Sequence, residues 1–478
     1  MDRPSWLLLA VSGAVPALVF YLGFVRRVTG ASRTAFQRRE PGRAEGTEQP
    51  PEDAWSPRLS HFLLQLVVHL TNTAFGQLFL VPLLMKINNF TLLRYLDIAE
   101  DPTFMPAVAS EGKSDPSESS NVSDILHKLM ETSPWDGGHC HVFCSLFDYC
   151  LFARSGELTP SQVAKNILAV LEDAEASPPL RAITQWNRGE IIKMAEESTI
   201  RYRNKEPLSL LDGIPVCLKE EIKVVPYHHR SGTQYLGLEP ETRDATVTKK
   251  LREAGAVIIG VSNMHELGIG TTGCNPNRYH GTPRNPYNLQ HFTGGSSSGS
   301  AAAVASGLCP LALGTDGGGS VRIPASFCGI VGLKGTFGRI SAFGCHPLSY
   351  STVSLGPLCA SVADAAVAYA VLAGPDPLYP YGLCQPKPSL PEVLTPDLKG
   401  LKLGIDCTFF KACDGEILAV CQKAVEFLKH LGASVVDVSV PEVEEIRVAH
   451  VICILSEMRD FLQPDFNNHF GQMIWMES

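Results

Sequence analysis

An excess of positive charge is absent from this chain of 478 residues, which has 40 Lys and Arg, 49 Asp and Glu, and a formal net charge of −9 at pH 7. Proteins that bind nucleic acid concentrate Lys and Arg on one face, so nucleic acid is excluded as a partner. No internal repeat is present. A content of 45% hydrophobic residues, with 41 glycines and 34 prolines, is typical of a packed, loop-rich enzyme. The length suits two or three domains or one large α/β domain.

Paired cysteine motifs are also missing. The 14 cysteines are scattered singly from Cys140 to Cys453, mostly beside apolar residues. This pattern favours small buried thiols in a reducing compartment over a disulfide framework. The cluster of His139, Cys140, His141 and Cys144 lacks a second ligand pair at zinc-finger spacing, so we interpret it as a packed turn. The sequence predicts no metal site and no cofactor.

Charge is absent from residues 5–25, a run of 21 residues that is followed by Arg26, Arg27 and further arginines. A segment of this length can cross a bilayer, and arginines after it place the rest of the chain on the cytoplasmic side. We therefore expect residues 1–27 to be a single-pass transmembrane anchor in an endomembrane, with the C-terminal domain in the cytoplasm. The alternative is a cleaved signal peptide with Arg3 in its leader, although its apolar region is longer than such leaders carry.

Two further segments precede the globular part of the chain. Residues 28–58 are rich in Arg, Glu and Pro, a composition that predicts a solvated linker. Residues 59–156 form an N-terminal extension with a second apolar segment at 61–85. Polar residues interrupt that segment, among them Gln65, His69, Asn72 and Gln77. Because polar groups make a membrane span costly, we expect an interfacial or core-packed helix, and leave a second span open.

From residue 157 to residue 478 the pattern becomes that of a globular α/β domain. A helix is predicted to begin at Pro160, where Thr159 and Gln162 can form a capping box. Helical patterns follow over 164–176, 189–202, 244–254, 301–305, 364–373 and 415–431, and strand patterns over 213–220, 256–260, 311–313, 401–405 and 433–440. Helices and strands in alternation predict a sheet covered by helices on both sides.

The candidate chemistry lies in residues 293–324, where two serine-glycine clusters, 294–299 and 317–320, flank a predicted helix and strand. A helix of about eleven residues climbs roughly 16 Å and a strand of about five residues returns roughly 16 Å, so the clusters can meet in space. Ser320 follows three glycines, whose N–H groups can converge on one oxyanion, and is the candidate nucleophile. Ser296 is the candidate proton relay. The alternative is two flexible loops around a buried hairpin.

A histidine base is missing from this region, because no histidine lies between His291 and His346 and neither of these belongs to a distinctive motif. Lys219 ends an apolar strand. Burial there would lower its pKa, so that the neutral amine could act as a base. The alternative is a lysine that only solvates the end of a strand.

A Ser-His-Asp esterase is a further alternative. Residues 295–299 match the pattern G-x-S-x-G with Ser297 as the nucleophile. The nucleophile of such enzymes follows a buried strand, whereas residues 285–293 read as a polar loop.

The motifs together resemble those of the amidase signature family, and among its members those of the fatty acid amide hydrolases. The residues that carry the resemblance are GIPVCLKE at 213–220, DATV at 244–247, GGSSSG at 294–299, GTDGGGSVRIP at 314–324 and GIVGLK at 329–334. Their order, spacing and residue types are specific, and the resemblance covers residues 157–478. It implies an α/β fold with a mixed β-sheet core covered by helices.

The resemblance also implies a mechanism and its residues. Lys219 is the general base, Ser296 is the bridging serine on a cis peptide, and Ser320 is the nucleophile that forms an acyl-enzyme. The family further implies oxyanion N–H groups from the glycines before Ser320, and three residues that order the loop; these are Gly317, Gly318 and Gly319, and Ser297, Asp316 and Arg322. The expected partners are a lipid amide substrate and a membrane, and a homodimer is left open.

Three departures from the family pattern are present. Gly317 stands where many relatives carry an aliphatic residue, and Gly335 where proline is common, and both are tolerable backbone changes. Relatives also continue beyond the region matched by Ser478, so we expect the catalytic domain to be C-terminally incomplete. A catalytically silent, membrane-anchored binding protein is therefore the alternative to a serine amidase that hydrolyses fatty acid amides.

Overall fold

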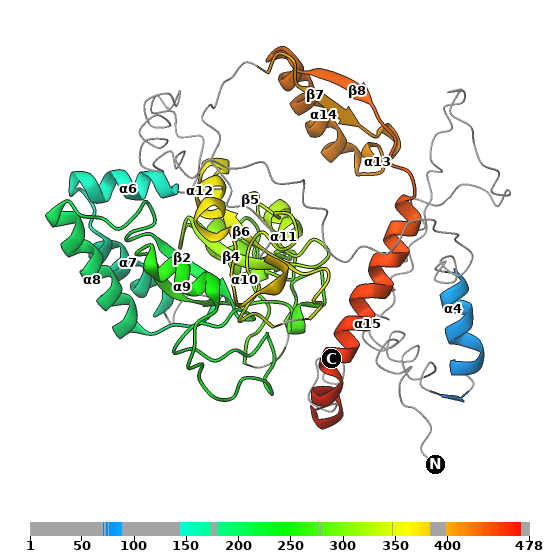
Figure 1. Cartoon of the computed structure of the whole chain (residues 1–478), viewed down its shortest axis with the longest axis horizontal. Helices are drawn as coiled ribbons and strands as arrows, with labels where there is room; N and C mark the ends of the chain where they lie inside the picture. Colours follow the sequence, from blue (N-terminus) through cyan, green and yellow to red (C-terminus); the bar gives the residue numbers. More distant parts are fainter. Residues whose placement is uncertain are drawn as a thin grey trace. The chain divides into compact units, whose positions relative to one another are not determined.

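The computed structural model describes residues 70, 73–74, 76–87, 144–173, 179–275, 277, 279–346, 348–382 and 398–469 (Figure 1). The chain divides into two compact units. One consists of Met1–Ile98 and Val393–Ile452, and the other of Ala99–Glu392 and Cys453–Ser478. The expected anchor at 5–25, the linker at 28–58 and the His139–His141 cluster lie outside the described residues, so the boundaries drawn around them stay predictions.

The larger unit is built on a six-stranded sheet with the strand order β1-β3-β2-β4-β6-β5. The strands are β1 (Ile183–Gln185), β2 (Pro215–Lys219), β3 (Val257–Ser262), β4 (Leu311–Asp316), β5 (Val331–Gly332) and β6 (Ser354–Cys359). Strand β2 is parallel to both β3 and β4, whereas the pairs β1–β3, β4–β6 and β5–β6 are antiparallel. The predicted mixed sheet is therefore confirmed.

Helices cover this sheet. They are α6 (Leu146–Ser155), α7 (Pro160–Leu171), α8 (Arg188–Asn204), α9 (Thr246–Glu253), α10 (Ser298–Ala305), α11 (Arg322–Phe327) and α12 (Val362–Leu372), with short 3₁₀ turns η3 (Glu266–Gly268) and η4 (Pro380–Gly382). Helices α7, α8, α9, α10 and α12 match predicted helical patterns, whereas α6 and α11 were not predicted. The predicted capping box at the start of α7 is present, because the side chains of Thr159 and Gln162 each bond the backbone N–H of the other. Helix α7 ends at Leu171, five residues before the predicted end.

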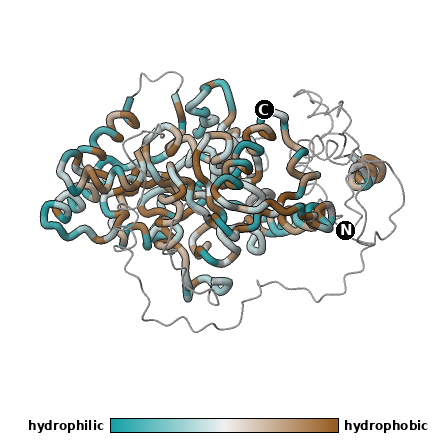
Figure 2. The backbone as a smooth tube through the Cα atoms, turned by 90° about the horizontal axis from the view of Figure 1, so that it is seen from above, coloured by the Kyte–Doolittle hydropathy of each residue, from teal (hydrophilic) through white to brown (hydrophobic). Residues whose placement is uncertain are grey.

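Successive residues of β2 point to opposite faces of the sheet, as a strand requires. Val216 and Leu218 pack in a cluster with α6, α9 and α12. Cys217 packs in a second cluster with α7, α8 and α10. Lys219, two residues after Cys217, follows the same alternation toward the α10 face. Figure 2 shows the hydrophobic segments gathered inside the unit and the hydrophilic ones around it.

Helix α10 packs unusually close to the sheet because its residues are small. All eight residues from Ser298 to Ala305 are buried. A Cβ at Gly299 would lie 2.3 Å from the carbonyl oxygen of Ala182 and 2.4 Å from the amide nitrogen of Asn263, so only glycine fits there. This close approach sets the start of α10 against the backbone just before β1 and just after β3.

The smaller unit contains the remaining described elements. They are the π-helical turn η1 (Gly76–Leu80), α4 (Val81–Ile87), β7 (Lys402–Ile405), α13 (Cys407–Phe410), α14 (Gly415–His430) and β8 (Ser434–Asp437). Strands β7 and β8 form a parallel pair, as expected for a strand-helix-strand connection. Helix α15 (Val443–His469) contributes residues to both units.

A membrane-spanning helix is not found among the described residues, since none of their helices combines the length and the apolar character that a bilayer requires. The part of segment 61–85 that the structure describes contains η1 and α4, in which Leu78, Phe79 and Leu83 are exposed.

Candidate active site

Lys219 lies at the carboxyl end of β2, where all five strand residues are buried. Its side chain is inaccessible to solvent. The ammonium nitrogen Nζ donates to the hydroxyl oxygens of Ser296 at 2.7 Å and Thr315 at 2.8 Å, and it lies 2.6 Å from Oε1 of Glu221. The structure thus brings together the lysine and the bridging serine, which are 77 positions apart in the chain.

The electrostatics of Lys219 suit a base. Burial lowers the pKa of its ammonium group, because the charged form loses hydration. The carboxylates of Glu221 and Asp316 oppose this effect, but the net direction remains downward. A lysine with a lowered pKa is neutral at a lower pH than an exposed lysine and can therefore accept a proton.

Ser296 connects this lysine to the loop that precedes α10. The peptide bond between Gly295 and Ser296 is cis, as the resemblance to the family implies. The serine is only 1% exposed, and its carbonyl oxygen accepts the backbone N–H of His265 at 3.0 Å. The next residue binds the nucleophile loop, because the N–H of Ser297 donates to the carbonyl oxygen of Ser320 at 3.2 Å. The predicted return of α10 and β4 to a common point is confirmed.

Ser320 is partly exposed, in contrast to Ser296. Within the part of the chain that the structure describes, no hydrogen bond joins the hydroxyl groups of Ser320 and Ser296. Such contacts are often long in enzymes without substrate and shorten in the complex. The structure therefore joins a loop with a partly exposed Ser320 to the buried Ser296–Lys219 pair through the backbone of Ser297.

The glycine loop before Ser320 is held by one buried carboxylate. Asp316 accepts the backbone N–H groups of Gly319 at 2.7 Å and Val321 at 3.2 Å. The guanidinium of Arg322 binds the same carboxylate through two contacts of 2.9 Å. Burial alone would raise the pKa of Asp316, but the Arg322 guanidinium and these N–H groups hold it below its usual value.

The oxyanion roles of Gly317, Gly318 and Gly319 stay predictions. The N–H of Gly319 already donates to Asp316, whereas Gly318 is exposed beside Ser320. This arrangement makes the exposed Gly318 a better candidate for an oxyanion donor than Gly319.

Ser297 does not have the surroundings of a nucleophile. It is fully buried at the start of α10, and its hydroxyl donates to the carbonyl oxygen of Thr315 at 3.4 Å. The polar loop before it contains no strand between β3 and α10 among the described residues. These contacts agree with a loop-ordering role and do not support the esterase alternative.

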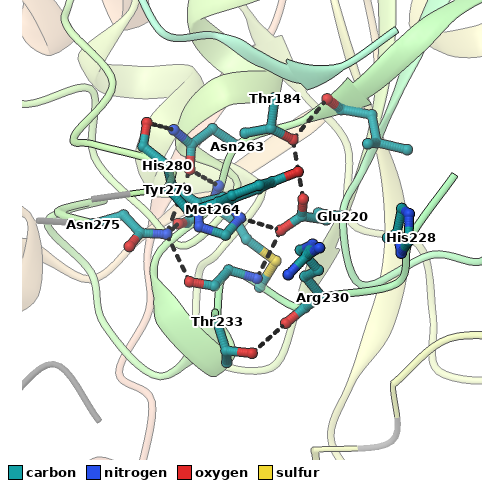
Figure 3. Close-up of polar contacts among 12 residues, drawn as sticks. Thr184, Glu220, His228, Arg230, Thr233, Asn263, Met264, Asn275, Tyr279 and His280 are labelled. Atoms are coloured by element: carbon teal, nitrogen blue, oxygen red, sulfur yellow. Dashed lines mark hydrogen bonds and ion pairs between the residues drawn. The ribbon is translucent and has the colours of Figure 1, made fainter. Parts of the chain in front are cut away.

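A buried pair of Glu220 and His280 next to Lys219 was not predicted from the sequence. The carboxylate of Glu220 faces the ring of His280, with Oε2 2.6 Å from Nε2 (Figure 3). It also accepts the backbone N–H of Gly232 at 2.9 Å and two side-chain donors, the Thr184 hydroxyl at 3.0 Å and the Gln185 amide at 2.9 Å. The sequence signal is the run Lys219-Glu220-Glu221 directly after an apolar strand, which we interpreted only as the charged end of the strand.

The other ring nitrogen of His280 faces an amide oxygen. Nδ1 lies 3.0 Å from Oδ1 of Asn277, which also accepts the backbone N–H groups of Tyr279 and His280 and is therefore oriented as an acceptor. Both ring nitrogens thus meet acceptors, the arrangement of an imidazolium. Although burial raises it, the charge and hydrogen bond of His280 hold the pKa of Glu220 below its usual value.

Comparison with known proteins agrees with the geometry. The family model described as Amidase matches residues 165–475. The chain is 36% identical to the fatty acid amide hydrolase of Medicago truncatula, over 88% of this chain and 72% of that protein. It is 37% identical to the fatty acid amide hydrolase of Arabidopsis thaliana, over 86% and 71%. Among solved structures, the native peptide amidase of Stenotrophomonas maltophilia is similar with a TM-score of 0.62 and 32% identity, over 70% of this chain and 69% of that one.

Proposed function

The chain belongs to the amidase family and is an amidase of the Ser-cisSer-Lys type, and on this basis we propose that it hydrolyses fatty acid amides to a fatty acid and an amine. The observation that carries the proposal is the buried contact of 2.7 Å between Lys219 and Ser296 at the base of the loop that bears Ser320. An acyl transfer needs a nucleophile, a base and an oxyanion site, and these residues supply the first two.

The proposed reaction begins with the neutral amine of Lys219. It accepts a proton from the Ser296 hydroxyl while Ser296 accepts the proton of Ser320, and the Ser320 oxygen forms a bond to the carbonyl carbon. The carbonyl oxygen becomes an oxyanion at the N–H groups of the glycine loop. The same relay returns a proton to the nitrogen as the carbon–nitrogen bond breaks and the amine leaves. Water, deprotonated through Ser296 and Lys219, then hydrolyses the acyl-enzyme and releases the fatty acid.

A lipid amide substrate is supported by two observations. The relatives with similarity over most of the chain are named fatty acid amide hydrolases. The uncharged segment at residues 5–25 has the length of a membrane anchor. An amidase bound to an endomembrane, with its catalytic domain in the cytoplasm, encounters amphiphilic amides in the bilayer where they accumulate.

The catalytic proposal is tested with a fluorophosphonate probe, which reacts with activated serines. The chain purified from membranes is labelled and assayed for hydrolysis of oleamide. Ser320→Ala is expected to abolish both signals and Lys219→Ala to reduce both. Ser326→Ala, which removes an exposed serine of α11, is the matched control and should leave them unchanged. Labelling that survives Ser320→Ala would refute the mechanism. If labelling were lost in Ser297→Ala but kept in Ser320→Ala, the result would favour the esterase alternative.

The membrane proposal is tested separately. A reporter fused to residues 1–57 is expected to resist extraction of membranes by alkaline carbonate, whereas a reporter fused to residues 28–57 should be soluble. Recovery of the first fusion entirely in the soluble fraction would remove the anchor from the proposal without affecting the catalytic residues.

A further inference from the structure

The amine of Lys219 has one acidic neighbour that no part of the triad requires. Oε1 of Glu221 lies 2.6 Å from Nζ, and both side chains are buried, with exposed fractions of 1% and 0%. Thr315 completes the group, because its hydroxyl donates to Oε1 of Glu221 and accepts from Nζ of Lys219 at 2.8 Å. Lys219 ends β2, Glu221 follows it by two residues, and Thr315 is the penultimate residue of β4.

The hydrogen-bonding partners of Lys219 determine where the electron pair of its neutral amine points. An ammonium group has three donor positions, and here they meet the oxygens of Glu221, Thr315 and Ser296. When the group loses one proton, two N–H bonds and one electron pair remain. The Glu221 carboxylate accepts only, and the Thr315 hydroxyl already donates its hydrogen to Glu221. Ser296 is then the one partner with a hydrogen to donate to the amine.

The charge of Glu221 acts in the opposite direction to burial. It is the largest influence that raises the pKa of Lys219. The other titratable groups that face this lysine are Asp316 and Cys345, whose influence has the same sign, and His265, which burial and the lysine charge keep neutral by lowering its pKa to about 4. Asp316 is paired with Arg322, whereas the carboxylate of Glu221 is in direct contact with Nζ of Lys219.

This inference rests on the proposed function of Lys219 as the base. We propose that Glu221 is a positioning residue for this base, which holds the amine with its electron pair toward Ser296 and sets the pH at which the amine becomes available. Before each turnover the ammonium group transfers one proton to water. The neutral amine then takes the Ser296 proton, and the Glu221 carboxylate stabilises the ammonium that forms again.

The pH profile separates positioning from a merely structural role. The substrate is lauroyl 4-nitroanilide, and rates are expressed per serine labelled by the fluorophosphonate, so that unfolded molecules do not count. Glu221→Gln keeps an acceptor oxygen and removes the charge. Because an opposite charge in contact shifts a pKa by about one to three units, the acidic limb of kcat/KM should move to lower pH by about one unit or more, with KM changed less than about twofold.

Glu221→Asp is the second variant and keeps the charge while withdrawing the carboxylate by one methylene. Its rate on the pH plateau is expected to fall about tenfold, since the amine is less well held. Glu241→Gln is the matched control, because Glu241 forms its ion pair of 3.0 Å with the partly exposed Lys223 and not with Lys219, and its acidic limb should stay in place.

The outcomes distinguish this proposal from the proposed function. Labelling that survives Ser320→Ala refutes the catalytic mechanism whatever Glu221 does. If Ser320→Ala is inactive as expected, an unmoved acidic limb in Glu221→Gln overturns the role of Glu221 alone. If Glu221→Gln fails to fold, Glu221→Asp decides, and an unchanged plateau rate there overturns the proposal.

Discussion

The side chain of Ile454 occupies the space that a side chain at position 317 would need. A Cβ built on Gly317 would lie 3.1 Å from Cδ1 of Ile454 and 3.2 Å from Cγ2 of Val353, closer than ordinary van der Waals contact. The resemblance to the family implies an aliphatic residue at this position in many relatives. In this chain the aliphatic side chain of Ile454 in α15 lies at this point, beside the loop that bears Ser320.

This relationship predicts a compensating pair of substitutions. Gly317→Ile should lower kcat/KM for lauroyl 4-nitroanilide by about tenfold or more, because overpacking costs about 1–3 kcal/mol and displaces the loop. Ile454→Ala alone should have a smaller effect. The double variant should recover most of the lost activity, and this coupling is measured by a double-mutant cycle. Losses that simply add would mean that the two positions do not share the space.

Lys219 predicts the direction of the pH dependence. Activity requires the neutral amine, so kcat/KM should rise as the pH increases through the pKa of this lysine. Since that pKa is lowered, the rise should occur below the range of an exposed lysine. Lys219→Arg, which stays charged at all usable pH values, should lose about 10²–10⁴-fold in rate and show no such rise.

The control for this prediction is Lys223→Met, which removes a nearby lysine of 39% side-chain exposure. Its profile should match that of the unaltered protein. An acidic limb that persists in Lys219→Arg would assign the titration to another group.

The Glu220–His280 pair should make the loss of stability in His280→Ala depend on pH. Removing one partner of a buried ion pair costs about 3–5 kcal/mol, so His280→Ala should lower the free energy of unfolding by about this amount at pH 7. The folded-state pKa of Glu220 is depressed. Its stabilising contribution is therefore complete above the unfolded-state pKa and is lost as the pH falls through the folded-state value.

The measurement is urea unfolding of the unaltered protein and of His280→Ala at pH 7 and pH 4. The difference in the free energy of unfolding between the two proteins should be smaller at pH 4 than at pH 7. Arg188→Ala breaks an exposed pair with Glu172, whose side chains are 64% and 41% exposed, and should cost less than about 1 kcal/mol at either pH. An equal loss at both pH values for His280→Ala would contradict the linkage to Glu220.

Asp316 and Arg322 predict unequal effects on the rate. Asp316→Asn removes the charge that orients two backbone N–H groups and the guanidinium, and should lower kcat by about 100-fold, the effect of a misplaced oxyanion site. Arg322→Ala should cost only about tenfold, because the arginine side chain is 53% exposed and the two N–H contacts to Asp316 remain.

Arg201→Ala provides the comparison for these variants. Arg201 binds Asp212 through the same kind of two-point contact, at 2.7 Å each, away from the site. Its rate per labelled serine should be unchanged. If Arg322→Ala lowered kcat more than Asp316→Asn did, the loop would depend on the arginine itself and not on the carboxylate.

The buried elements near the site were predictable because their sequences leave few alternatives. Strand β2 is an apolar run that ends in charge, and α10 consists of small residues between two glycine clusters. Their predicted positions and the meeting of Ser296 with Lys219 are confirmed. The signal for these two elements is local in the chain, because burial on both sides requires a run of apolar or small residues. The pairing of Ser296 with Lys219, 77 positions apart, was implied only by the resemblance to the family.

Other elements carried no local signal. Strands β1 and β5 have three and two residues, too few for a period to appear. Strand β6 contains Gly356 and Pro357, which argue against a strand, although Pro357 pairs with Leu313 in the sheet. The burial of Glu220 and Glu221 could not be read from the sequence either, because their partners His280 and Thr315 come from segments about 60 and 94 positions away.

The parallel pairing of β2 with β4 determines when activity appears during refolding. Leu218 pairs with Leu313, 95 positions further along the chain and beyond β3 and α10, and contacts of such long range form slowly. Lys219, Thr315 and Asp316 are brought together only when that pairing is complete. Reactivity of Ser320 toward a fluorophosphonate during refolding would therefore report the closing of the central sheet and not the formation of any single helix or loop.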